Sequence, residues 1–91
     1  MKRIHKQIVR MGEFQYRLPY KSRIVHFGVD VNHSLCMWYE FRDPSPGTNT
    51  VVKQIRTFRV FGTGHTVPDN SEYLHTTIVG QYVWHLYEIL P

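Results

Sequence analysis

The fold is decided by the segment Phe58-Arg59-Val60-Phe61-Gly62-Thr63-Gly64-His65-Thr66-Val67-Pro68-Asp69. An apolar strand runs into a Gly-Thr-Gly-His corner, where backbone amides, a hydroxyl and an imidazole lie close together. Such a corner can bind a ligand, and nothing beside it in the sequence resembles a catalytic apparatus. The segment therefore predicts a strand that ends at a binding corner.

Short apolar runs of the same kind recur along the 91-residue chain. Gly, Pro, Asn, Asp or Ser separates them, and no window repeats apolar residues at helical spacing for three turns. The predicted strands are Ile4–Met11, Phe14–Leu18, Arg23–Val29, Leu35–Arg42, Val51–Phe61, Tyr73–Val79 and Tyr82–Leu90. We expect one all-β domain over residues 1–91, with six or seven mainly antiparallel strands, little or no helix, and the form of a small barrel or a compact sandwich.

Two connections predict hairpins. Val31-Asn32-His33-Ser34 joins two strands, and Asn tolerates the positive φ that tight turns require, whereas Gly80-Gln81 suits a type II′ turn. The second turn predicts the pairs Val79–Tyr82, Ile78–Val83, Thr77–Trp84, Thr76–His85 and Leu74–Tyr87. Both faces of that hairpin are largely apolar, so we expect both to be covered, by a sandwich, a closed barrel or a second subunit. The segment 43–49, with two prolines, is predicted to be a loop.

Charge and aromatic content point to a partner. Seven of the eleven Lys and Arg residues, but one of the seven acidic residues, lie within residues 1–23. This basic segment would attract phosphates or an acidic protein, or would simply be a solvated face. Thirteen aromatic rings exceed what one small core usually needs, so some are expected to face a ligand or another subunit of a homo-oligomer.

The compartment is inferred from what the chain contains. Cys36 is the single cysteine and lies in an apolar run, which is typical of a buried residue in a reducing cytosol. The residues after Met1 show neither a signal peptide nor an apolar stretch that would span a bilayer. We expect a cytoplasmic protein with no membrane contact.

Several separated segments resemble a known family. They are Phe58 to His65, Val67-Pro68-Asp69, Tyr73-Leu74 and Tyr82 to Glu88, with Leu35 to Trp38 upstream. Together they resemble a domain of unknown function found in small bacteriophage and prophage proteins, marked by a TGH-x-[VI]-P corner and a VWH-x-x-E strand. The resemblance implies a phage origin, the host cytoplasm and a β-rich fold, and it implies no reaction.

The residues also suggest a ligand. Arg56 and Arg59 would bind phosphate, the corner Gly62–His65 would supply amides and imidazole, and Trp38 or Trp84 would stack a base, with His85 nearby. Alternatively, the corner glycines permit a tight turn and the rings belong to the core. The remaining histidines are not spaced as zinc ligands, so we expect no metal and no cofactor.

These observations favour a non-enzymatic binding protein. Neither Cys36 nor a Ser-His-Asp set has the surroundings that nucleophilic catalysis needs. By analogy with small phage proteins, we expect the protein to antagonise host antiviral defence, and the preferred form is sequestration of an anionic (cyclic) nucleotide signal. The alternatives are an inhibitor that docks on a host protein and a protein that binds single-stranded nucleic acid.

Overall fold

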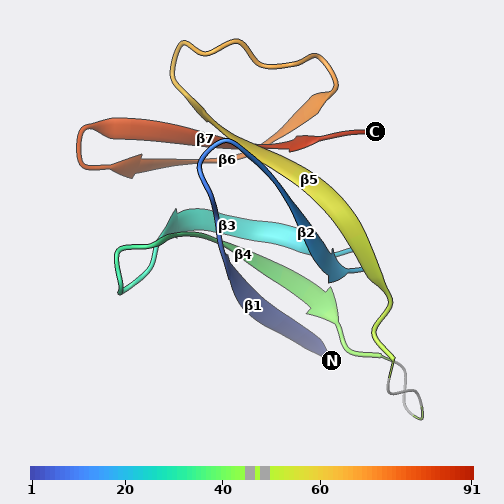
Figure 1. The fold of residues 1–91 in the computed structure, drawn as a ribbon. Coiled ribbons are helices and arrows are strands. Elements are labelled where there is room, and N and C mark those ends of the chain that lie inside the picture. The colour runs from blue at the N-terminus through green and yellow to red at the C-terminus, as the bar shows by residue number, and fades with distance from the viewer. Residues whose placement is uncertain (45–46, 48–49) are drawn as a thin grey trace.

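Seven strands make up the ordered framework of the computed structural model, which describes residues 1–44, 47 and 50–91 (Figure 1). Their bounds are β1 Lys2–Ile8, β2 Glu13–Pro19, β3 Arg23–Val29, β4 Leu35–Arg42, β5 Lys53–Gly62, β6 Ser71–Val79 and β7 Tyr82–Ile89. The described part of the chain contains no helix, and so none that could cross a membrane. The predicted all-β class is confirmed.

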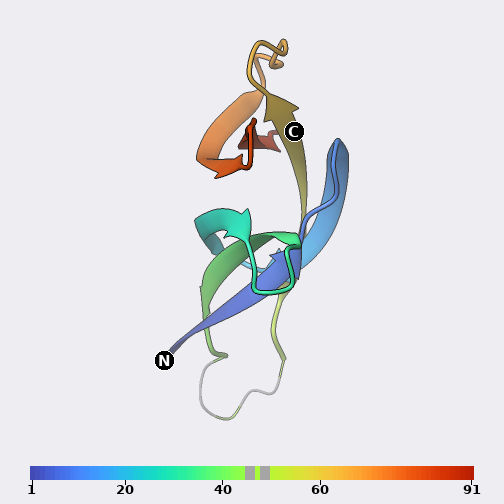
Figure 2. The same cartoon turned by 90° about the vertical axis from the view of Figure 1, so that its left-hand side faces the viewer.

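The strands form two antiparallel sheets rather than one closed barrel. The first has the order β1-β4-β3 and the second β2-β5-β7-β6. Figure 2 shows the two sheets as separate layers, and β3 of the first packs against β6 of the second. Of the two predicted forms, the compact sandwich is therefore the observed one.

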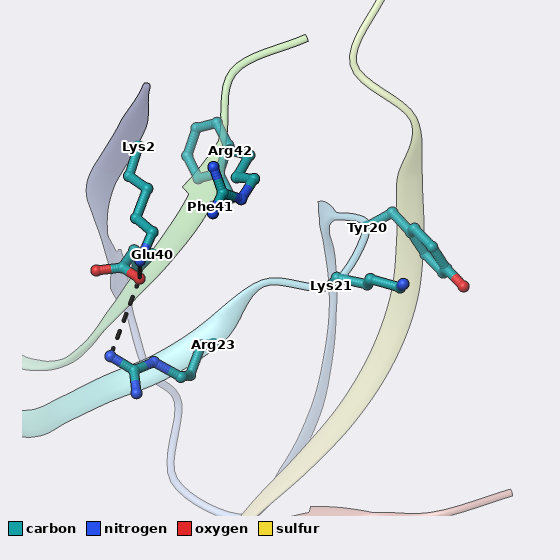
Figure 3. A pocket seen from close by; sticks show the side chains of 7 residues that line it. All are labelled: Lys2, Tyr20, Lys21, Arg23, Glu40, Phe41 and Arg42. Carbon is teal, nitrogen blue, oxygen red and sulfur yellow. Dashed lines mark ion pairs between the residues drawn. The ribbon is translucent and has the colours of Figure 1, made fainter. Parts of the chain in front are cut away.

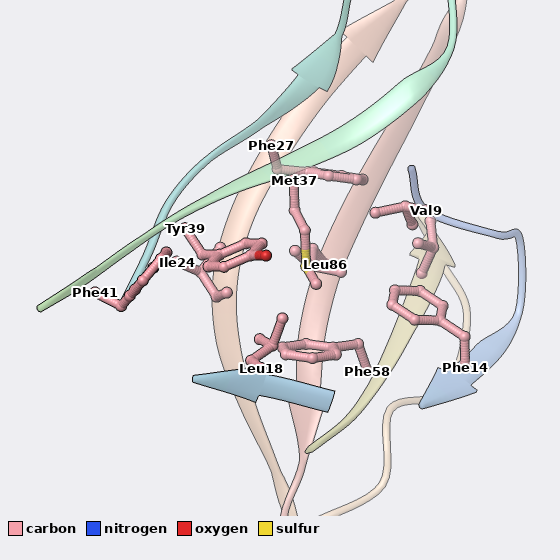
Figure 4. Close-up of a cluster of buried hydrophobic side chains, with 11 residues drawn as sticks. Val9, Phe14, Leu18, Ile24, Phe27, Met37, Tyr39, Phe41, Phe58 and Leu86 are labelled. Carbon is pink, nitrogen blue, oxygen red and sulfur yellow. The ribbon is translucent and has the colours of Figure 1, made fainter. Parts of the chain in front are cut away.

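Alternating apolar residues on β2, β4 and β5 build the core between the sheets (Figure 4). Phe58 and Leu86 of the larger sheet and Met37 and Phe27 of the smaller one are fully buried. The rest of the core cluster consists of Val9, Phe14, Leu18, Ile24, Tyr39, Phe41 and Val60. The opposite faces of both sheets are left to carry the surface side chains.

The last hairpin follows its predicted register for four pairs and then departs from it. Gly80 has a φ of +60°, as a type II′ turn requires at its first central residue, and pairs from Val79–Tyr82 to Thr76–His85 are confirmed. The predicted pair Leu74–Tyr87 is wrong, because the register shifts between Tyr73 and His75. The extra residue of this β-bulge turns Leu74 toward the core and sets Tyr73 against Tyr87.

Three other local predictions are adjusted. The positive φ in the β3–β4 turn lies at His33 and not at Asn32, because the Asp30 carboxylate accepts hydrogen bonds from two backbone amides of the turn. β1 ends at Ile8, short of Met11, since Gly12 turns the chain at a φ of +85°. The loop predicted at 43–49 includes residues 45, 46, 48 and 49, which lie outside the described residues.

Candidate functional site

The Gly-Thr-Gly-His corner forms at the end of β5, where strand hydrogen bonding stops. Gly64 has a φ of +91°, which permits the turn, and the Gly62 amide donates to Nδ1 of His65 at 3.1 Å. A neutral His65 therefore carries its proton on Nε2. A Cβ at Gly62 would lie 3.2 Å from the His65 ring and 3.4 Å from the Trp84 indole, so the corner packs two rings against this glycine.

His85 joins the corner to the neighbouring hairpin through hydroxyl groups. Its Nε2 lies 2.9 Å from Oγ1 of Thr63, and its Nδ1 lies 2.9 Å from Oγ1 of Thr76, which in turn is 2.7 Å from the Tyr73 hydroxyl. A hollow of about 190 Å³ lies beside this chain of groups, lined also by Phe61 and Tyr87. It is smaller than the roughly 300–1,000 Å³ of ordinary small-molecule sites.

The two arginines predicted to bind phosphate have different surroundings. Arg56 donates to both carboxylate oxygens of Glu88, at 2.7 and 2.6 Å, and to the Ser22 carbonyl. Its side chain is 14% exposed, so it is occupied by internal partners. Arg59 is exposed and its guanidinium lies 5.0 Å from the Phe61 ring centroid, beside the corner.

The two tryptophans lie apart. Trp84 belongs to the second sheet, is half-buried against the core, and stacks on Tyr82 at 5.8 Å. Trp38 belongs to the first sheet, beside His26. The structure thus brings together the corner, Trp84, His85 and Arg59, and it separates Arg56 and Trp38 from them.

A larger hollow at the other end of β5 was not predicted. Figure 3 shows it between the ends of β1, β3 and β4 and the turn that follows β2. We call it the basic pocket; its volume is about 490 Å³. Its lining consists of Lys2, Tyr20, Lys21, Arg23, Glu40, Phe41 and Arg42.

Strand register places the charges of the basic pocket on one face. Lys2 pairs with Arg42 across β1 and β4, and Arg23 pairs with Glu40 across β3 and β4. Glu40 lies 3.4 Å from the Lys2 ammonium and 3.9 Å from the Arg23 guanidinium. One carboxylate therefore serves two cations.

The turn at residues 19–22, which hydrogen bonds hold in place, positions Tyr20 at the basic pocket. The Ser22 hydroxyl and amide both donate to the Pro19 carbonyl, and the Tyr20 amide donates to the Val52 carbonyl at 2.8 Å. Lys21 has a φ of +62° there, and its ammonium lies 5.6 Å from the Tyr20 ring centroid. Tyr20 is 57% exposed, so its ring is available for stacking.

The signal for this pocket is present in the sequence. Three of its four cations fall in the basic segment 1–23, which we expected to attract phosphate. The fourth, Arg42, comes from β4, and only the pairing of β1 with β4 brings it to the pocket.

Elsewhere, electrostatics stabilise the β3–β4 turn. Asp30 accepts hydrogen bonds from Lys6 at 2.7 Å and from two turn amides, and these bonds lower its pKa to about 2. Burial, with Asp30 nearby, raises the pKa of the Cys36 thiol. Cys36 is thus a buried thiol, as predicted. Within the described residues no three His, Cys, Asp or Glu side chains could together hold a metal ion.

Comparison with known proteins gives one result. The model of DUF7352, a domain of unknown function, matches residues 1–90. The chain belongs to this family. No curated protein and no solved structure matches it. Family membership assigns no activity.

Proposed function

We propose that this DUF7352 protein is a non-enzymatic binding protein for an anionic nucleotide, held in the basic pocket. The observation that carries the proposal is the meeting of four cations and one carboxylate around a hollow of about 490 Å³ with an exposed tyrosine at its rim. That volume lies within the range of small-molecule sites, whereas the hollow at the corner is below it.

The charge of the basic pocket supports an anionic ligand. Glu40 compensates part of the charge of Lys2 and Arg23. Among the ion pairs of the described residues, neither Lys21 nor Arg42 has a carboxylate partner. A phosphate group would provide the missing negative charge, and Arg42 offers it the forked donor geometry that phosphate oxygens favour.

The rim of the basic pocket supports a nucleotide over a simple phosphate. The Tyr20 ring offers a flat face on which a base would stack, and Lys21 lies against the same ring. A stacked base contributes about 1–3 kcal/mol in proteins that bind unpaired bases. The ring and the cations would therefore hold the two ends of one nucleotide.

The resemblance to phage proteins supports a biological setting for this binding. In the host cytoplasm, a protein that captures a nucleotide alarm signal would weaken antiviral defence without catalysis. Exposed apolar side chains at the hairpin ends, such as Val31, Ile78 and Tyr82, support self-association into a homo-oligomer. Sequestration needs a high concentration of sites, and a small oligomer supplies several per particle.

Calorimetric titration with cyclic and linear nucleotides, and with nucleosides as uncharged controls, tests the proposal. We expect nucleotides to bind, nucleosides not to bind, and the nucleotide to be recovered intact. Arg42→Glu and Lys21→Glu should each weaken binding at least tenfold, with Arg59→Glu, on the exposed surface beside the corner, as the matched control. Loss of binding in Arg59→Glu alone, or no binding by any nucleotide, would refute the basic pocket as the site.

A further inference from the structure

A second hollow adjoins the basic pocket. Its volume is about 230 Å³, and Phe41 lines both. Arg17 of β2 and Lys53 at the start of β5 contribute its cations, and His5 of β1 adds an imidazole. The second hollow therefore adds two positive charges from the larger sheet to the four that come from the basic pocket.

A third hollow, of about 590 Å³, shares walls with both. It has Tyr20 and Arg42 in common with the basic pocket, and Pro19 and Val51 in common with the second hollow. The three hollows therefore adjoin one another, and we call the surface that they line together the basic groove. Its lining includes six Lys and Arg side chains and two carboxylates, Glu40 and Asp43.

The two carboxylates of the basic groove offset only part of this charge. Glu40 already serves Lys2 and Arg23, and Asp43 is paired with Arg3, a further cation outside the groove lining. One nucleotide carries too few phosphates to reach all six cations, which are divided between the basic pocket and the second hollow. A strand that bears one phosphate per residue matches a groove of this kind.

We infer that the ligand of the basic groove is a single-stranded nucleic acid, of which the nucleotide in the basic pocket is one unit. This inference rests on the proposed nucleotide binding and extends it to a class of ligand. Tyr20 indicates an unpaired strand, because its exposed ring can stack on a base only when that base is not already stacked in a duplex. The described residues also contain no helix that could enter a major groove.

Fluorescence anisotropy with a labelled twelve-residue oligothymidylate, and competition by thymidine monophosphate, tests this inference. If about four phosphates are neutralised, log K should fall with log salt with a slope near −3. Affinity would then drop roughly fifty-fold between 50 and 200 mM salt. The mononucleotide should bind more weakly and depend little on salt, and a duplex of the same length should compete poorly.

Variants distinguish oligonucleotide binding along the basic groove from mononucleotide binding in the basic pocket. Arg17→Gln and Lys53→Gln should each weaken oligonucleotide binding several-fold and reduce the salt slope by about 0.7, while leaving mononucleotide affinity unchanged. Arg42→Gln should weaken both ligands, and Arg59→Gln neither. Thermal melts verify that each variant is folded.

The outcomes distinguish the two claims. Equal affinity for mononucleotide and oligonucleotide, with no effect of Arg17→Gln or Lys53→Gln, would overturn the inference and leave nucleotide binding intact. Failure of both ligands to bind would overturn both. Competition by a poly-glutamate peptide as strong as that by the unlabelled oligonucleotide would show a general acidic-surface receptor and would also overturn the inference.

Discussion

Replacing Arg56 by Met should be among the most damaging single changes to a charged residue. The guanidinium makes two hydrogen bonds to the Glu88 carboxylate and one to the Ser22 carbonyl, and the two charged side chains are 14% and 13% exposed. Arg56→Met would leave a nearly buried carboxylate without its cation. Breaking a buried ion pair from one side costs about 3–5 kcal/mol, and because some solvent still reaches this pair we expect about 3 kcal/mol.

Urea and thermal unfolding measure this loss. For a domain of this size, 3 kcal/mol corresponds to a fall of about 12–24 °C in melting temperature. Arg59→Met is the matched control, since Arg59 is on the same strand and exposed, and its contact with Phe61 contributes at most about 1 kcal/mol.

A double variant distinguishes the effect of the unpaired Glu88 charge on stability from the effect of lost packing around Arg56. Arg56→Met with Glu88→Leu removes both buried charges and should recover most of the stability that Arg56→Met alone loses, because desolvation no longer goes uncompensated. If Arg56→Met costs under about 1 kcal/mol, as an exposed pair would, the assignment of Arg56 to an internal structural role is incorrect. The same conclusion follows if the double variant loses the sum of the two single effects.

Three further perturbations have expected outcomes. The hydrogen bonds of Asp30 hold its pKa at about 2, below the ordinary 3.8. The contribution of Asp30 to stability is therefore present above pH 4 and disappears as the pH falls to about 2. Thermal melts at each pH should show that the stability difference between wild type and Asp30→Asn narrows across that window. A constant difference down to pH 2 would contradict the depressed pKa. Gly62→Ala should cost about 1 kcal/mol by pushing the His65 ring off its backbone donor, and the same change made together with His65→Ala should cost clearly less in urea unfolding. Phe58→Ala removes a fully buried ring and should cost about 4 kcal/mol, enough to leave the chain largely unfolded by circular dichroism at 37 °C; a cooperative melt above 50 °C would argue against its central place in the core.

Local signals were sufficient to locate the strands and the turn of the last hairpin. Gly80 specifies a turn that neighbouring residues can recognise, and the pairs next to it follow from counting. The bulge beside Leu74 could not be predicted in this way, because it depends on which face the core of the other sheet covers. Counting residues outward from the turn therefore predicts the register of the hairpin only as far as the bulge at Leu74.

The candidate sites also differ in how far they could be predicted from neighbouring residues in the sequence. The Gly62–His65 corner is contiguous in the sequence and was predicted as a unit, whereas its contact with His85 depends on the pairing of β5 with β7. The partner of Arg56 lies 32 residues away, and nothing near Arg56 indicates it. Basic composition indicated an anion-attracting region, and strand pairing over long range was needed to place Arg42 beside Lys2.

The pairing of β1 with β4 and of β2 with β5 has a consequence for synthesis of the chain. While the ribosome makes the protein, β1 has no neighbour until β4 begins to emerge at Leu35, and β2 has none until β5 begins to emerge at Lys53. Until then the backbone groups of both strands stay unpaired. Strand pairs that are far apart in the sequence also form more slowly than local hairpins. The positive charges along β1 would then oppose aggregation, because like-charged strands on adjacent nascent chains repel each other.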